Sequence, residues 1–257
     1  MFLLSNYGLL ESWLEGEYMN MSKRNVNVVL VHGAWADGSG WSSVIQPLQA
    51  AGSRVLAVAI PLTSLSDDIA ALERILERTE GPVVLVAHAY AGAVISAIRN
   101  ERVGALCFIA ALIPDEGETV AEVFYRGDSH PLAPKLEPDT HGFIWLPEEA
   151  FATAFAQHAT RGQSALLSAT QRPISVACIQ QPAGSPAWRR KPSIRCSYLV
   201  AAEDRMISPQ TQRFLASRAG ADVTSAKVDH MPMVTDPKAV IGIITAAVSA
   251  IGEERRA

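Results

Sequence analysis

The chain alternates between short apolar runs and longer amphipathic stretches. Apolar, β-branched runs predict strands at residues 26–31, 55–60, 83–87, 103–111, 194–201 and 222–228. Apolar positions spaced three or four residues apart predict helices at about 41–51, 66–78, 90–99, 209–218 and 237–251. Strands that alternate with helices build a mostly parallel sheet with helices on both faces. The predicted fold class is therefore α/β.

This alternation breaks between about residue 112 and residue 193. The segment is richer in Pro, Gly, His and Gln, and it contains short helical pieces at 147–158 and 162–169. It is too long for a loop and too irregular to continue the sheet. We therefore expect a helical cap inserted into a single domain that covers residues 26–257.

Residues 1–25 form a separate N-terminal extension in this interpretation. The apolar run Phe2-Leu3-Leu4 is too short for a signal peptide, and Glu11, Glu15 and Glu17 fall where an apolar core should continue. The extension is either an appended helix or the product of an upstream start codon. Whether it belongs to the native protein stays open.

Residues 83–92 end a predicted strand and begin a predicted helix. A G-x-S-x-G sequence at such a turn lifts a nucleophilic serine above a parallel sheet. Here the five residues are Ala87-His88-Ala89-Tyr90-Ala91. Ala89 therefore stands at the serine position and offers no hydroxyl.

Two further loops carry an acid and a base. Asp204 follows the predicted strand at 194–201, and His230 follows the strand at 222–228. Parallel sheets bind their ligands beyond the carboxyl ends of the strands, which is where both residues lie. Nucleophile position, acid and base then follow one another in the chain order of an acyl-transfer triad.

With these residues the chain resembles the small α/β-hydrolase family of hydroxynitrile lyases and plant methylesterases, and more closely its bacterial esterase-like members. The resemblance spans about residues 26–251 and implies an α/β-hydrolase fold. The runs that carry it are Val29-Leu30-Val31-His32-Gly33-Ala34-Trp35, Pro61-Leu62-Thr63-Ser64-Leu65, Gly81-Pro82-Val83-Val84-Leu85-Val86, Pro114-Asp115-Glu116-Gly117-Glu118, Glu203-Asp204-Arg205-Met206-Ile207 and Asp229-His230-Met231-Pro232-Met233. The family usually shows G-H-S-Y-G-G at the elbow, of which His88, Tyr90 and Gly92 match.

The resemblance implies a role for several residues. Asp204 would be the acid that orients His230, and His230 the base that moves the proton. The backbone N–H groups of Ala34 and Tyr90 would form an oxyanion hole, which needs no particular side chain. The candidates for lining the pocket are Trp35, Trp145 and Met233.

The other histidines are expected to be structural. We expect His32 to hydrogen-bond its own loop and His88 to pack and hydrogen-bond beneath the elbow. His130, His141 and His158 lie in the expected cap without the spacing of metal ligands. The prediction is therefore an enzyme without a metal or another cofactor.

The composition indicates which binding partners and which cellular compartment to expect. The formal net charge of -4 gives no general attraction to nucleic acid or to an anionic membrane. No run approaches the roughly 18 apolar residues of a membrane span. The three widely spaced cysteines, Cys107, Cys178 and Cys196, form no disulfide or metal pattern, which favours the cytoplasm. The expected partner is a small-molecule substrate or ligand, and a homodimer is left open.

Three explanations of Ala89 compete. It is a laboratory Ser→Ala change, or the mark of an enzyme that uses the His230–Asp204 dyad without a covalent step, or the mark of a silent protein that binds a small apolar ligand. Ala87 and Ala91 also replace the usual glycines, which an engineer would have no reason to change, so natural divergence is favoured. The leading hypothesis is an enzyme that acts on a small apolar ester, lactone or other carbonyl compound.

Overall fold

A central parallel sheet organises the computed structural model, which describes residues 26–254. The extension predicted for residues 1–25 lies outside the described residues. The strand order is β2-β1-β3-β4-β7-β8, and all neighbouring strands in this sheet are parallel. The strands are β1 (Asn27–Val31), β2 (Arg54–Val58), β3 (Val83–His88), β4 (Val103–Ile109), β7 (Arg195–Ala201) and β8 (Asp222–Ala226). The predicted α/β fold class is confirmed.

The apolar composition of the inner strands explains their central place in the sheet. Every residue of β1 and of β3 is buried, as expected for strands that are covered on both faces. Their register pairs Val31 with Ala87, so the two strands end side by side. The outer strands β2 and β8 are more exposed because each has a neighbour on one side only. The loops after the strands therefore converge at one edge of the sheet.

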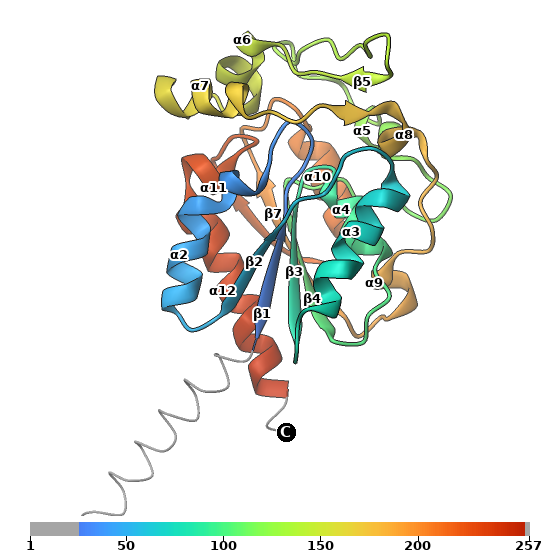
Figure 1. The fold of residues 1–257 in the computed structure, drawn as a ribbon, viewed down its shortest axis with the longest axis vertical. Coiled ribbons are helices and arrows are strands. Elements are labelled where there is room, and N and C mark those ends of the chain that lie inside the picture. Colours follow the sequence, from blue (N-terminus) through green and yellow to red (C-terminus); the bar gives the residue numbers. More distant parts are fainter. Residues whose placement is uncertain (1–25, 255–257) are drawn as a thin grey trace, which may run out of the picture.

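Helices cover both faces of the sheet (Figure 1). Helices α2 (Ser42–Ala50) and α12 (Pro237–Glu254) contact each other on one face, and α3 (Leu65–Glu77) and α4 (Ala91–Ala97) contact each other on the other. Two further helices, α10 (Pro209–Arg218) and the short α11 (Pro232–Thr235), follow β7 and β8.

Residues 112–193, which we call the cap segment, cross the carboxyl ends of the strands over most of their length, and residues 187–190 lie beside α4 (Figure 1). The elements in this segment are α5 (Val120–Phe124), β5 (Phe143–Ile144), α6 (Glu148–Ala150), the π-helix η2 (Phe151–Phe155), α7 (Arg161–Ala169), β6 (Ile174–Ser175), α8 (Val176–Gln180) and α9 (Ala187–Arg190). Strands β5 and β6 pair antiparallel, which the sequence did not predict. Backbone N–H groups of Trp35 and Ser175 bond the carbonyls of Arg172 and Leu62, at 2.9 and 3.0 Å, and so tie the cap segment to the core loops.

Candidate active site

The turn between β3 and α4 holds Ala89 in a left-handed conformation. Its φ is 49°, a region that non-glycine residues seldom occupy. The N–H of Ala89 donates to the carbonyl of Ile109 at 3.2 Å, and its carbonyl accepts from Leu112 at 2.9 Å and Gly92 at 3.1 Å. Ile109 at the end of β4 and Leu112 shortly after it thus fix this sharp turn. This is the backbone geometry of a nucleophile elbow.

Two glycines allow this turn to pack closely. A Cβ atom on Gly33 would lie 2.9 Å from both the Cβ atom of Ala89 and the carbonyl oxygen of His88. A Cβ atom on Gly92 would lie 2.4 Å from the carbonyl oxygen of Leu112. No side chain fits at either position without a shift of neighbouring atoms, so the loop after β1 and the segment after β4 both enclose the turn.

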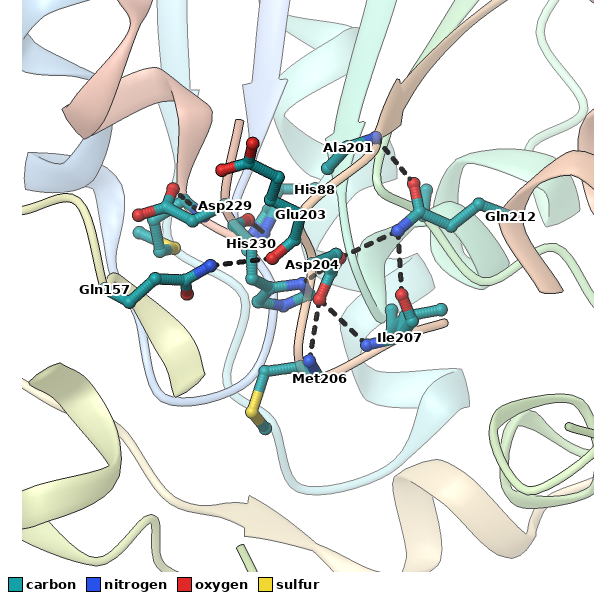
Figure 2. Close-up of polar contacts among 12 residues, drawn as sticks. His88, Gln157, Ala201, Glu203, Asp204, Met206, Ile207, Gln212, Asp229 and His230 are labelled. Atoms are coloured by element: carbon teal, nitrogen blue, oxygen red, sulfur yellow. Dashed lines mark hydrogen bonds and ion pairs between the residues drawn. The ribbon is translucent and has the colours of Figure 1, made fainter. Parts of the chain in front are cut away.

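His230 and Asp204 meet at the same edge of the sheet. Nδ1 of His230 lies 2.8 Å from Oδ2 of Asp204, and both side chains are buried. The other oxygen of Asp204 accepts from the backbone N–H groups of Met206 at 2.7 Å and Ile207 at 2.9 Å. Gln212 donates its side-chain amide to Oδ2 at 2.8 Å (Figure 2). A carboxylate held in this way favours the proton on Nδ1 of the imidazole and leaves Nε2 as a base.

Two more histidines support this arrangement and stay neutral. Nε2 of His88 lies 2.8 Å from the carbonyl oxygen of His230, and the two rings are 4.7 Å apart. Burial, followed by the nearby His230, lowers the pKa of His88 well below its usual value. Nδ1 of His32 lies 2.9 Å from the carbonyl oxygen of Gly33, and burial lowers the pKa of His32 to about 4. The predicted hydrogen bond of His32 within its own loop is confirmed, and His88 is buried and hydrogen-bonded as predicted.

An apolar cavity lies between the turn at Ala89 and the cap segment. The space open to the centre of a water molecule is about 50 Å³, within about 540 Å³ of empty volume. The cavity is lined by Ala34, Trp35, Ala89, Tyr90, Leu112, Val120, Ala121, Phe124, Tyr125, Leu136, Ile144, Ile174, Ile179 and Ile207. None of these side chains is charged. The indole N–H of Trp35 donates to the carbonyl of Ile144 at 2.9 Å, and the hydroxyl of Tyr90 donates to Asp68 at 2.7 Å.

The predicted site residues are only partly brought together. Trp35 lines the cavity as predicted. The prediction is wrong for Trp145, which is 51% exposed and donates its indole N–H to the exposed Asp139 at 3.2 Å. It is also wrong for Met233, which is buried in the core through α11 and does not line the cavity. His230 does not line the cavity itself. The centroid of the Phe155 ring lies 5.3 Å from the centroid of the His230 imidazole.

Asp68 and Phe155 are site residues that the sequence prediction missed. Asp68 is fully buried, and it accepts bonds from the hydroxyl of Tyr90 and from the N–H of Leu62, each at 2.7 Å. Burial raises the pKa of Asp68. Its position in the sequence was informative, because it shares the apolar face of α3 with Leu65 and Leu72. Phe155 lies in the irregular cap segment, where no periodicity marks the inward side.

Metal-binding clusters and membrane-spanning helices are both absent from the described part of the chain. Among residues 26–254 no cluster of three or more His, Cys, Asp or Glu side chains could hold a metal ion. No described helix is both long enough and apolar enough to cross a membrane. Cys107, Cys178 and Cys196 are free and buried.

Comparison with known proteins identifies the family. Residues 28–243 match the model of the alpha/beta hydrolase family. The chain belongs to this family. The match covers most of the sheet, the cap segment and both loops that carry Asp204 and His230. The sequence resemblance described above is thereby confirmed at the level of the superfamily.

Individual relatives of this α/β-hydrolase are distant. Methylesterase 2 of Arabidopsis thaliana is 25% identical, with 86% of this chain and 95% of the relative aligned. Norfluorocurarine synthase 1 of Strychnos nux-vomica is also 25% identical, with 84% and 93% aligned. A solved pyrethroid hydrolase from Sphingobium faniae superposes with a TM-score of 0.75 at 21% identity, over 89% of this chain and 99% of that one. The structural likeness establishes the common fold.

Proposed function

We propose that this α/β-hydrolase is an enzyme that acts on a small apolar ester, lactone or other carbonyl compound through His230 and Asp204, without a covalent intermediate. The hydrogen bond between Nδ1 of His230 and Asp204 carries the proposal. It leaves Nε2 of a buried, oriented imidazole to act as a base beside a turn that has the geometry of a nucleophile elbow.

In the proposed hydrolysis, water takes the place of the missing serine. Its oxygen attacks the substrate carbonyl carbon while Nε2 of His230 accepts its proton, and Asp204 stabilises the imidazolium. When the tetrahedral intermediate collapses, the imidazolium returns the proton to the leaving oxygen. The bond between the carbonyl carbon and that oxygen breaks, so the products are an acid and an alcohol.

Backbone amides would stabilise the negative charge of the intermediate. The candidates are the N–H groups of Ala34 and Tyr90, which both line the cavity next to Ala89. Neither N–H donates a hydrogen bond to another residue within the described range 26–254, so both are available to an oxyanion. Removing one donor of this kind typically costs about 3 kcal/mol of transition-state stabilisation.

No other described side chain near the turn is suited to replace the serine. The thiol of Cys178 contacts Asp68 at 3.6 Å, and burial raises its pKa to about 12. The hydroxyl of Tyr90 donates to the same carboxylate, and burial raises the pKa of Tyr90 well above its usual value. Neither group is ionised at neutral pH, so neither is an activated nucleophile.

The apolar cavity supports the proposed class of substrate. Its lining contains no charged side chain, and the polar atoms of Trp35 and Tyr90 are bonded within the protein. Burial of apolar substrate surface would therefore supply most of the affinity. The name of one relative, a methylesterase, is consistent with ester substrates.

Hydrolysis of a panel of small aryl esters and lactones tests the proposal. We expect His230→Asn to lower kcat/KM by about 10²- to 10⁴-fold, the usual contribution of a general base. Asp139→Asn, an exposed aspartate of the cap segment, is the matched control and should retain the rate. Unchanged hydrolysis in His230→Asn protein, with the fold intact by circular dichroism, would overturn the proposal.

A second candidate is a catalytically silent protein that binds a small apolar ligand. The position of His230 favours it, because Phe155 packs on the imidazole and His230 does not line the cavity. Binding of an environment-sensitive apolar dye, measured by fluorescence, separates the two functions. A silent binder takes up the dye with equal affinity in wild-type and His230→Asn protein and hydrolyses none of the esters.

A further inference from the structure

We infer that Gln157, His158 and Asp229 are positioning residues. Through them the cap segment fixes the position of His230 relative to Asp204. This inference deepens the proposed function and rests on it for its catalytic meaning. Its structural basis is that consecutive residues of the cap segment bond the residue before each member of the pair. Figure 2 shows the side chains of Gln157 and Asp229 beside His230.

The first connection reaches the loop of the acid. The side-chain amide of Gln157 donates to the carbonyl oxygen of Glu203 at 2.6 Å, and Glu203 immediately precedes Asp204. The N–H of Glu203 donates in turn to the carbonyl of Val228 at 3.1 Å, so the same residue also links the loop of Asp204 to the loop of His230. The side-chain oxygen of Gln157 is buried without a partner among the described residues, which leaves this one bond to fix the side chain.

The second connection reaches the loop of the base. The N–H of His158 donates to Oδ2 of Asp229 at 2.9 Å, and Asp229 immediately precedes His230. The other oxygen of this fully buried carboxylate accepts from the N–H of Met231 at 3.1 Å and from the hydroxyl of Thr235 at 2.6 Å. Asp229 therefore joins the cap segment to both sides of His230. A buried acceptor of this kind is costly to disrupt because its donors lose their partner.

A third contact lies between these two. The ring of Phe155 packs against the imidazole of His230 with 5.3 Å between centroids, and the ring of His88 contacts the same imidazole at 4.7 Å. Phe155 ends the π-helix η2, in which the N–H of Ala156 bonds the carbonyl of Phe151 at 2.8 Å. Such a turn is rare and is often found at functional sites. Phe155 at the end of this turn contacts the imidazole of His230, and after the turn Gln157 bonds the residue before Asp204 and His158 bonds the residue before His230.

The ion pair beside these bonds contributes less. Nε2 of His158 lies 3.0 Å from Oε2 of Glu203, but the two side chains are 39% and 45% exposed. Exposed pairs of this kind contribute little because water screens them. The bonds to the carbonyl of Glu203 and to the fully buried carboxylate of Asp229 therefore carry the positioning.

The Nδ1 proton of His230 reports on this arrangement directly. In an imidazole that is hydrogen-bonded to a buried carboxylate, this proton is protected from exchange and gives a resolved downfield NMR signal. We expect the signal in wild-type protein, with its assignment established by its absence in His230→Asn protein. Release of the cap segment frees the ring and exposes the proton, so exchange with water should remove the signal.

The matched control is another half-buried glutamine of the cap segment. Gln181 donates its side-chain amide to the hydroxyl of Ser66 at 2.6 Å and accepts from the N–H of Ser66 at 3.2 Å. It therefore also bonds the cap segment to the core, but at α3. We expect Gln157→Ala and Asp229→Asn to lose the proton signal and Gln181→Ala to retain it. A signal that persists unchanged in Gln157→Ala protein would overturn the inference, and this variant decides if Asp229→Asn does not fold.

Kinetics give a second readout with any ester that the wild-type protein hydrolyses. Gln157→Ala should lower kcat at least tenfold and change KM less than twofold, whereas Gln181→Ala should leave kcat within twofold of wild type. Equal kcat values in the two variants would contradict positioning. Because the NMR experiment contains no substrate, it can support the inference even when the wild-type protein turns over no ester and the proposed function fails.

Discussion

The hydroxyl of Tyr90 donates a hydrogen bond of 2.7 Å to the fully buried carboxylate of Asp68. The same carboxylate holds the N–H of Leu62 at 2.7 Å and the thiol of Cys178 at 3.6 Å. One acid thus connects the turn after Ala89, the loop after β2 and helix α8 of the cap segment. Tyr90 also lines the apolar cavity, so Asp68 fixes one wall of the candidate site.

Replacement of Asp68 should destabilise the protein strongly. Asp68→Ala leaves the hydroxyl of Tyr90 and the N–H of Leu62 buried without an acceptor, and we expect a loss of roughly 3 kcal/mol in the free energy of unfolding. The neighbouring Asp67 is exposed and its carboxylate accepts from the hydroxyl of Thr63 at 2.8 Å, so Asp67→Ala should cost less than about 1 kcal/mol. Urea denaturation measures both. Equal midpoints for the two variants would contradict a structural role for Asp68.

Gly92 is predicted to be irreplaceable at the elbow. The methyl group of Gly92→Ala would lie 2.4 Å from the carbonyl oxygen of Leu112, and backbone atoms must move to relieve that contact. Overpacking of this kind typically costs about 1–3 kcal/mol. Gly242 in α12 has no atom within 4 Å of its missing Cβ, so Gly242→Ala should instead stabilise by about 0.5–1 kcal/mol. Thermal unfolding of the two variants should show shifts of opposite sign.

The fold should lose stability as the pH falls below neutral. Burial lowers the pKa of His32 to about 4 from 6.5, so between these values the unfolded chain binds more protons than the folded chain. Stability then decreases as the pH drops through this window, by about 2 kcal/mol at pH 5 and about 3 kcal/mol in full. The buried His88, whose pKa is also lowered, acts in the same direction.

Urea unfolding at pH 7 and pH 5 measures this dependence. We expect the free energy of unfolding of His32→Gln protein to differ less between pH 7 and pH 5 than that of wild-type protein. His141→Gln removes an exposed histidine and should leave the difference unchanged. A His32→Gln variant with the full wild-type dependence would contradict the assignment of this acid sensitivity to His32.

Much of the fold could be predicted from the sequence because parallel strands buried on both faces are continuous apolar runs. The run at 83–87 predicted β3, and the helix expected at 209–218 is found as α10 with the same bounds. The contact between Asp204 and His230 also agrees with the order of the elements along the chain. The strands that precede the two residues, β7 and β8, are neighbours in the sheet. Residues that follow neighbouring parallel strands lie close together even when they are distant in the sequence.

The cap segment was much less predictable. Its elements are too short to establish a period, so the sequence did not reveal that Phe155 points inward and that Trp145 is exposed. Strands β5 and β6 have two residues each, too few to show an alternation of apolar and polar positions in the sequence. The bonds from Gln157 and His158 to the dyad loops likewise depend on how the segment folds over the sheet.

Restoration of the serine tests whether the elbow is intact. In Ala89→Ser protein, the left-handed turn should present the new hydroxyl to His230, as in a serine esterase. We expect stoichiometric labelling by an organophosphonate that reacts with activated serines, whereas wild-type protein stays unlabelled. Adding His230→Asn to this variant should abolish the labelling. An unreactive Ala89→Ser variant would contradict the view that this turn retains the geometry of an elbow.

The most direct measurement of the central claim is rapid-quench mass spectrometry of the intact wild-type protein during hydrolysis of an aryl ester. The account predicts that product accumulates while the mass of the protein stays unchanged, and that His230→Asn stops the accumulation. An increase in protein mass equal to the acyl group would show a covalent intermediate and would contradict the account.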